Sequence, residues 1–217
     1  MPPDRCIVLD VDGTLVDSNY HHVVAWQAAF AEHGQSVAAW EIHRAVGMGA
    51  DKLVPALLGN EAADEIGAAV SAGHDTRFQR AIGDVQPLPG ARDLLSALKR
   101  RGLAVALGSS AGAEEVDHYL RLLDATELVD HVTTAADVDR TKPDPDLIQT
   151  AIEQAGVPAV AMIGDTVWDC RAAAAVDLRM LALLCGGISE AELRGAGAHS
   201  VHRDPTELAS ALDSVLT

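Results

Sequence analysis

The chain has 217 residues, of which 48% are hydrophobic and 22% are charged, a composition typical of a globular protein with one or two domains. Sixteen Lys and Arg against 32 Asp and Glu leave a formal net charge of −16, which repels nucleic acids and anionic membrane surfaces. We therefore expect no nucleic-acid or membrane partner. A phosphorylated ligand would have to be attracted locally, by a metal ion or by a few basic or N–H groups.

The cysteines and the apolar stretches indicate where the protein works. Cys6, Cys170 and Cys185 are odd in number and lack paired spacing, which favours a reducing compartment over a disulfide framework. The longest near-apolar stretch, 180–188, is far shorter than the ~20 residues that span a bilayer, and the first residues carry no secretory signal. We expect a cytoplasmic protein that is a monomer or a small homo-oligomer.

Five short apolar runs alternate with helical segments along most of the chain. Their length and their apolar character on both faces predict buried parallel strands, at residues 6–9, 103–108, 129–134, 160–163 and 180–184. Helices are predicted over 91–101, ending before Gly102, and over 144–155, ending before Gly156. This alternation indicates right-handed βαβ units, and therefore an α/β fold with a doubly wound, Rossmann-like parallel sheet.

One interval interrupts the alternation. Residues from about 18 to 83 predict several helices in a row and no strand, and the prolines and glycine of segment 86–90 mark the point where the α/β pattern resumes. We therefore expect two domains. Residues 1–17 and 84–217 would form the α/β core, and residues 18–83 an inserted, all-helical domain.

Two carboxylates follow the first predicted strand. Asp10 and Asp12 lie two residues apart, so they start out pointing the same way, and Gly13 lets the chain turn sharply behind them. Open α/β sheets bind ligands at the carboxyl ends of their strands. The pair could act on one reacting centre, although an acidic turn with Asp17 or Ser18 capping the next helix would give the same pattern.

Three more polar clusters follow later strands. Ser109 and Ser110 come just before a predicted helix, where hydroxyl and N–H groups suit phosphate oxygens. Lys142 stands in a loop ahead of another helix. Asp165 follows a strand, and Asp169 lies one helical turn further on. Each cluster alone is common in helix starts, solvated loops or helix caps. Only their combination indicates a function.

The four clusters, in this order, resemble the four motifs of the haloacid dehalogenase superfamily. The match covers residues 1–17 and 84–217, and the helical insertion after the first motif resembles the C1-type cap of that family. Within the family, the chain is similar to the phosphoglycolate phosphatase and β-phosphoglucomutase group. The matching residues are Asp10-Val11-Asp12-Gly13-Thr14, Ser109, Lys142 and Gly164-Asp165 with Asp169.

The resemblance implies a phosphatase that uses Mg²⁺ and acts on a small phosphorylated metabolite. Asp10 would be the nucleophile that forms an aspartyl phosphate, and Asp12 would protonate the leaving oxygen and then activate water. Mg²⁺ would be held by Asp10, Asp165 and the Asp12 carbonyl, with Asp169 binding directly or through a water.

The same resemblance assigns the groups around the phosphate. Lys142 and Ser109 would balance charge on the phosphoryl oxygens, and Lys142 would also keep Asp10 ionised. Thr14 and Ser110 would contribute to substrate binding. These local groups would supply the attraction that the net charge of −16 does not.

Asp12 argues against two other chemistries of the family. Haloacid dehalogenases lack an Asp two residues after the nucleophile. Phosphonatases also depart at that position and use a cap lysine, which makes Lys52 an unsuitable counterpart. Phosphoryl transfer is therefore expected over carbon–halogen or phosphonate cleavage.

A mutase is the nearer alternative. His22 lies twelve residues after Asp10, where mutases carry a His that helps to switch phosphate donors. The residue fits equally well on an amphipathic helix on which Trp26 packs at helical spacing. Mutases typically also carry basic residues at the positions of Gly112 and Ala50, which favours hydrolysis here.

Substrate choice is expected in the inserted domain, where the glycine-rich turn 47–49 joins two predicted helices. Arg44 and Lys52 flank this turn and could reach an anionic substrate group, as could His22; they could equally be solvated helix ends. Phosphoglycolate, a sugar phosphate and a nucleotide all stay open as substrates. The complete set of catalytic residues disfavours a non-catalytic binding or regulatory module on the same fold.

Overall fold

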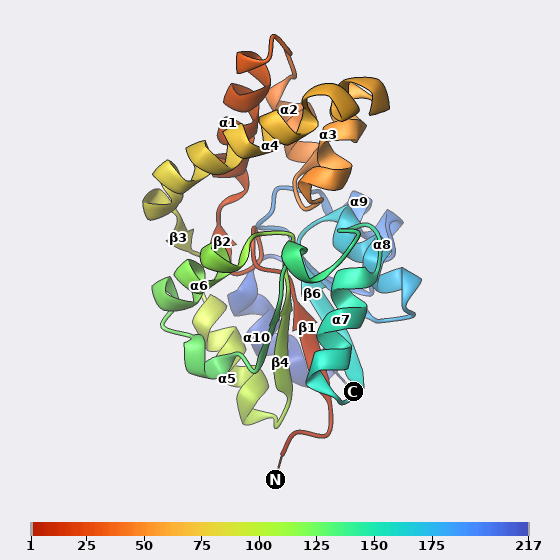
Figure 1. Ribbon diagram of the computed structural model, residues 1–217. Helices are drawn as coiled ribbons and strands as arrows, with labels where there is room; N and C mark the ends of the chain where they lie inside the picture. Colours follow the sequence, from red (N-terminus) through yellow and green to blue (C-terminus); the bar gives the residue numbers. More distant parts are fainter. Residues whose placement is uncertain (1, 217) are drawn as a thin grey trace.

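The computed structural model describes residues 2–216 and places a six-stranded parallel sheet beneath a group of four helices (Figure 1). The strand order is β5-β4-β1-β6-β7-β8, and each neighbouring pair is parallel. The strands are β1 (Cys6–Leu9), β4 (Ala104–Gly108), β5 (His131–Thr133), β6 (Ala159–Gly164), β7 (Met180–Leu183) and β8 (Ser200–His202). The predicted α/β fold is confirmed, with β8 as a further strand at the edge.

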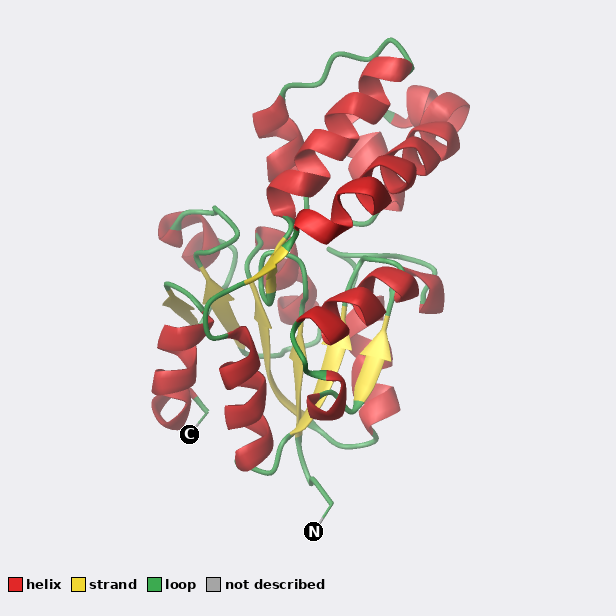
Figure 2. Ribbon diagram, turned by 90° about the vertical axis from the view of Figure 1, so that its left-hand side faces the viewer, coloured by secondary structure: helices red, strands yellow, loops and turns green. Residues whose placement is uncertain are grey.

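Helices cover both faces of this sheet (Figure 2). Because successive residues of a strand point to opposite faces, Ile7 and Leu9 join one hydrophobic cluster and Val8 joins the other. The first cluster includes side chains of α5 (Ala91–Arg100), α6 (Ala113–Leu122) and α10 (Pro205–Val215). The second includes side chains of α7 (Asp146–Ala155), α8 (Val167–Ala175) and α9 (Glu190–Gly195). The short runs predicted as buried strands are therefore apolar on both sides because both sides are covered.

The four helices at the end of the sheet follow one another without an intervening strand. They are α1 (Asn19–Glu32), α2 (Ala39–Ala45), α3 (Ala50–Leu58) and α4 (Asn60–Ala81), and we refer to them as the cap helices. They enclose a small hydrophobic cluster of their own, which includes Trp26, Phe30, Ile42, Leu53 and Val70. The helical spacing of Trp26 and Phe30 on α1 corresponds to this packing.

The chain enters and leaves the cap helices through two very short strands. β2 (Val16–Asp17) pairs antiparallel with β3 (Gln86–Pro87), and the 3-10 helix η1 (Ile82–Asp84) connects α4 to β3. Sequence patterns gave no sign of strands this short. The division into a core of 1–17 and 84–217 and a cap of 18–83 stays a proposal, and the β2–β3 pair lies beside both of its boundaries.

The two core helices that were predicted with bounds, 91–101 and 144–155, correspond to α5 and α7. α5 ends at Arg100 and α7 begins at Asp146, after Pro145, and stops at Gly156, whose φ of 66° is a conformation that glycine adopts readily. Two more 3-10 turns, η2 (Thr126–Leu128) and η3 (Ala135–Asp137), flank β5. Within residues 2–216 no helix combines the length and apolar character needed to cross a bilayer.

Candidate active site

The carboxyl end of β1 positions the two aspartates of the first motif. The backbone N–H of Asp10 donates to the carbonyl of Ile163, so the residue continues the pairing of β1 with β6 and its side chain stays buried. The chain then turns at Gly13, which has a φ of +70°. A Cβ at Gly13 would lie 2.2 Å from Oδ2 of Asp165, so the close approach of the two motifs also needs glycine.

Lys142 is completely buried beneath the first motif. Its Nζ lies 2.7 Å from Oδ1 of Asp10 and 2.8 Å from Oδ1 of Asp169. Burial acts to lower the pKa of Lys142, but the two carboxylates outweigh it and hold that pKa above its ordinary value. Burial raises the pKa of Asp10 to about 7, and the ammonium group of Lys142 opposes that rise. The lysine is thus a permanent cation facing the predicted nucleophile.

Asp165 and Asp169 complete the buried carboxylate cluster. Asp165 follows the last residue of β6, and its two oxygens accept hydrogen bonds from Thr14 Oγ1 (2.8 Å) and Asn19 Nδ2 (3.0 Å). Asp169 accepts from the backbone N–H and the hydroxyl of Thr166, the residue that caps α8. Burial, and then the charges of Asp169 and Asp10, raise the pKa of Asp165 well above its usual range.

This cluster fits a hard divalent cation. Asp10, Asp165 and Asp169 offer carboxylate oxygens that all lie within 4.8 Å of one another, and all three are buried. Lys142 supplies one positive charge against these three carboxylates, which leaves an excess of negative charge among buried side chains. Mg²⁺ prefers carboxylate oxygens, so the donor set suits it. Thr14, expected to touch substrate, instead donates its hydroxyl hydrogen bond to Asp165.

Asp12 faces a different set of partners. Its Oδ1 accepts a 2.5 Å hydrogen bond from Ser18 and lies 3.1 Å from His22 Nε2, which is itself 3.4 Å from Oε1 of Glu115. Burial alone would raise the pKa of Asp12, but His22 and Ser18 lower it. Burial alone would lower the pKa of His22, but Asp12 and Glu115 raise it to about 10. The Asp12–His22 pair therefore holds a proton at neutral pH.

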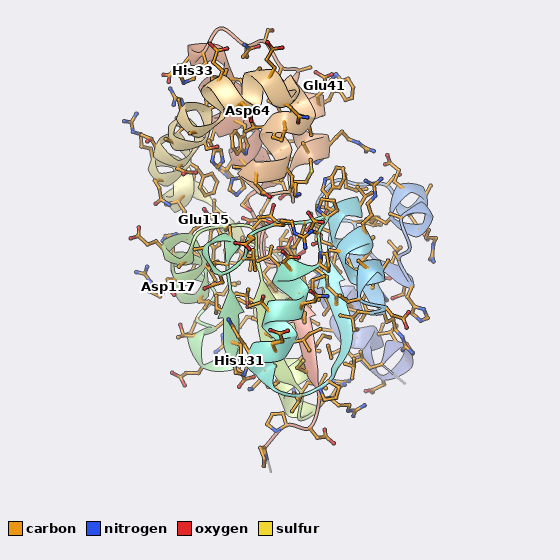
Figure 3. The ribbon with its side chains drawn as sticks, turned by 45° about the vertical axis from the view of Figure 1, so that its right-hand side comes forward. His33, Glu41, Asp64, Glu115, Asp117 and His131 are labelled. Carbon is orange, nitrogen blue, oxygen red and sulfur yellow. The ribbon has the colours of Figure 1, made fainter. Side chains whose placement is uncertain are left out.

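His22 belongs both to the site and to the packing of the cap helices. Its ring stacks on Phe78 with centroids 3.8 Å apart, and its Nδ1 lies 3.1 Å from Nε2 of His74 on α4. The two interpretations given by the sequence are thus compatible. Sequence reasoning did not find Ser18, His74 or Glu115 as neighbours of the motif, because no spacing relates them. Glu115 reaches the site from α6, at the junction between the core and the cap helices (Figure 3).

The two serines after β4 have separate contacts. Ser109 is buried, and its Oγ accepts a hydrogen bond from the N–H of Ala111 (3.0 Å). Ser110 donates from its Oγ to the carbonyl of Gly47 in the cap turn (3.2 Å) and also lines the pocket. Ser110 therefore joins the core to the cap at the edge of the site.

A pocket of about 120 Å³ lies between the core motifs and the cap helices. Its core side includes Asp10, Asp12, Ser110, Gly112 and Glu115, and its cap side includes Trp26, Ala50, Leu53, His74 and Asp75. Arg44 and Lys52 are not among the residues that line it. Arg44 forms an ion pair with Glu192, and Lys52 Nζ lies 2.6 Å from Oδ2 of Asp144, so both bind core carboxylates at the border between cap and core.

Comparison with known proteins identifies the family to which the chain belongs. A family model of haloacid dehalogenase-like hydrolases matches residues 5–177. A phosphoglycolate phosphatase of Pseudomonas syringae pv. tomato is 32% identical over 193 residues, which are 84% of this chain and 70% of that protein. The crystal structure of a hydrolase from Pseudomonas syringae superposes with a TM-score of 0.91 and 33% identity, over 98% of this chain and 100% of that chain.

A β-phosphoglucomutase from Clostridium difficile shares the fold, with a TM-score of 0.84 at 16% identity over 100% of this chain and 97% of that chain. The chain therefore belongs to the haloacid dehalogenase-like hydrolases. Within that family it is similar to phosphoglycolate phosphatases, and it is a phosphatase.

Proposed function

We propose that the enzyme hydrolyses a small phosphorylated metabolite, of the phosphoglycolate or sugar phosphate type, through an aspartyl phosphate on Asp10 and with the aid of Mg²⁺. The observation that carries the proposal is the ion pair between Asp10 and the fully buried Lys142, 2.7 Å apart, with Asp165 and Asp169 beside it. A buried carboxylate held against a fixed cation and facing a pocket is suited to attack on an electrophile.

In the first step, an oxygen of Asp10 attacks phosphorus and the bond from phosphorus to the alcohol oxygen breaks. The proton held by the Asp12–His22 pair passes through Asp12 to the leaving oxygen, so the alcohol departs neutral. Lys142 stays beside Asp10 while negative charge on the phosphoryl oxygens is redistributed. In the second step, Asp12 takes a proton from water, the water oxygen attacks phosphorus, and Asp10 is released with inorganic phosphate.

The carboxylate cluster gives Mg²⁺ its place in this scheme. Asp10, Asp165 and Asp169 would hold the ion, together with the carbonyl of Asp12, and the bound ion supplies positive charge that lets the phosphate approach four carboxylates. Asn19 and Thr14 orient Asp165 by hydrogen bonds to its two oxygens.

The test is hydrolysis of p-nitrophenyl phosphate with Mg²⁺ or with excess chelator, combined with intact-mass measurement after rapid quench. We expect no turnover in chelator, none from Asp10→Asn, and a longer-lived phosphoenzyme in Asp12→Asn, because hydrolysis of the aspartyl phosphate loses its base. Asp17→Asn is the matched control, since Asp17 is an exposed neighbour in β2 outside the site. Full activity of Asp10→Asn, or of the chelated enzyme, would refute the proposal.

A mutase is a second candidate because His22 contacts Asp12, as a residue that alternates between phosphate donors would. Against it, Gly112 and Ala50 line the pocket without the basic side chains that would retain a bisphosphorylated intermediate. Phosphorus NMR of a reaction with β-glucose 1-phosphate, Mg²⁺ and a trace of glucose 1,6-bisphosphate distinguishes the two. We expect inorganic phosphate to form, and glucose 6-phosphate formed much faster would establish the mutase.

A further inference from the structure

The pocket has two ends with different electrostatic character. At the phosphate end, Lys142 and the proposed cation site offset the negative charges of substrate and carboxylates. Beside Asp12, where the alcohol part of a phosphate monoester would leave, the lining includes the carboxylates of Glu115, which lies within 4.8 Å of the Asp12 carboxylate, and of Asp75 on α4. Within residues 2–216, no lysine or arginine lines this pocket. The leaving-group end therefore has no permanent cation of its own.

The imidazole rings of His22 and His74 do not replace the missing cation. His22 places Nε2 between the carboxylates of Asp12 and Glu115, at 3.1 and 3.4 Å, and Nδ1 against His74 Nε2 at 3.1 Å. The remaining nitrogen of His74, Nδ1, lies 3.0 Å from Oδ1 of Asp75. All four ring nitrogens thus have a protein partner, and any positive charge on His22 is already matched by two carboxylates. Neither ring offers a free donor to an anion.

Arg44 and Lys52, which could have reached an anionic substrate group or been solvated helix ends, form ion pairs outside the pocket. Arg44 pairs with Glu192 and Lys52 with Asp144, so both cations of the cap turn bind carboxylates of the core outside the pocket. Lys142 has no exposed surface and is occupied by Asp10 and Asp169. A second negative charge on a substrate would therefore meet carboxylates whose nearest cation, His22, is already shared between Asp12 and Glu115. Like charges that face each other cost affinity.

We propose that the enzyme selects phosphate monoesters whose alcohol part is uncharged or cationic, such as a hydroxylated or amino-bearing group, and discriminates against alcohols that carry a carboxylate or a second phosphate. This selectivity rests on the proposed phosphatase function and narrows it. Phosphoglycolate, whose alcohol part carries a carboxylate, becomes a poor substrate, and nucleoside diphosphates and triphosphates are excluded for the same reason. Discrimination comes from repulsion at the far end of the pocket rather than from a new attractive contact.

Three monoesters of nearly equal size test the idea: 2-phosphoglycolate, 2-hydroxyethyl phosphate and O-phosphoethanolamine, whose alcohol parts are anionic, neutral and cationic. We expect kcat/KM for both of the latter to exceed that for phosphoglycolate by at least about tenfold. A value for phosphoglycolate that equals or exceeds either of the others would overturn the proposal. Hydrolysis of p-nitrophenyl phosphate runs alongside, so that loss of all turnover is recognised as failure of the phosphatase function.

Selectivity can also be measured without turnover. Calorimetric titration of the three monoesters into Asp10→Asn with Mg²⁺ should give the same order of affinity, because the carboxylates of Asp75 and Glu115 remain while the nucleophile is gone. Equal dissociation constants, or tighter binding of phosphoglycolate, would refute the selectivity whatever the fate of the phosphatase function.

A charge placed in the pocket should reverse the discrimination. Gly112 lines the pocket, has an ordinary φ of −78°, and a Cβ there would meet nothing within 4 Å, so the backbone accepts a side chain at this position. In Gly112→Lys, the ratio of kcat/KM for phosphoglycolate to that for 2-hydroxyethyl phosphate should rise at least about tenfold over the ratio in Gly112→Gln, the uncharged control. Asp75→Asn should move the ratio in the same direction. An unchanged ratio in both variants would show that pocket charge does not set the choice.

Discussion

The core side and the cap side of the candidate active site are built in different ways. On the core side, Asp10, Lys142 and Asp165 are buried, and each is held by side chains that follow other strands of the sheet or begin the cap. On the cap side, the lining consists of ring and apolar side chains on α1, α3 and α4, and Asp75 is 74% exposed. The comparison teaches that the reacting groups are mostly buried core side chains that hold one another in place, while the choice of substrate rests on a few replaceable groups of the pocket lining.

The largest expected effect contrasts two lysines, one from each side of this comparison. Lys142→Met leaves Asp10 and Asp169 buried without a cation, so we expect a loss of about 3–5 kcal/mol in the free energy of unfolding and a fall in turnover of at least ~100-fold. Lys52→Met breaks a partly exposed pair with Asp144 and should cost at most about 1 kcal/mol. Urea unfolding of both variants measures the difference, and equal losses would contradict the contrast.

The next effect concerns a cap residue that acts on the core. His22→Gln removes the ring that shares a proton with Asp12, so hydrolysis of an alkyl phosphate should slow by about 100-fold. p-Nitrophenyl phosphate needs less protonation of its leaving group and should slow by only about tenfold. The ratio of the two rates separates a positioning role from general loosening of the helices, since loosening would slow both substrates alike.

A smaller effect is expected where the cap turn holds the loop of the catalytic lysine. Asp51 on α3 accepts hydrogen bonds from the backbone N–H (3.2 Å) and the hydroxyl of Thr141, the residue before Lys142. Asp51→Ala should raise KM by about tenfold, with kcat nearly unchanged, because the contact between α3 and the loop before Lys142 loses two hydrogen bonds while the buried cluster stays intact. Asp64→Ala, an exposed change on α4, is the matched control. A fall in kcat alone would place Asp51 with the reacting groups instead.

The smallest expected effect is a loss of stability on substitution of Asp130, which lies just before the edge strand β5. Asp130 accepts hydrogen bonds from Lys99 Nζ (2.6 Å) and the N–H of Val105 (2.8 Å). Burial acts to raise the pKa of Asp130, but the two hydrogen bonds outweigh burial and lower that pKa below its usual value. A carboxyl group with a lowered pKa stabilises the folded protein at pH values above its pKa in the unfolded chain, which is about 4. This stabilisation is lost as the pH falls through the pKa of the folded state. Asp130→Asn should therefore cost up to about 1 kcal/mol at pH 7 and less at pH 3. Urea titrations at the two pH values test this, and a constant difference would contradict it.

Much of the core was predictable because its signals are local. The five strands are short apolar runs, and parallel strands bring their carboxyl ends to one edge, so the polar residues that follow them had to meet. β8 was missed because Ser200–His202 has only one apolar residue, and β2 and β3 because two residues show no alternation. The predicted strands and the convergence of Asp10, Lys142, Asp165 and Asp169 thus follow from patterns within single segments.

The surroundings of the motifs were not predictable in this way. Asn19 and Asp165, which form a hydrogen bond, are 146 residues apart in the sequence, and Arg44 and Glu192, which form an ion pair, are 148 apart. Only tertiary packing brings these partners together. Glu115 stands at the start of α6 like many acidic residues in first helical turns, and nothing in its spacing points to His22. The contacts that decide substrate choice are of this kind, which is why the sequence left the substrate class open.

The pairing of β2 with β3 has a consequence for how such enzymes diversify. Because Val16 and Asp17 are hydrogen-bonded neighbours of Pro87 and Gln86, the chain departs from the core and rejoins it at almost the same point. A segment whose ends are already joined can grow, shrink or be exchanged at little entropic cost to the rest of the chain. We expect lineages with this core to have changed their substrates by exchanging the inserted segment, while the sheet beneath it kept its register.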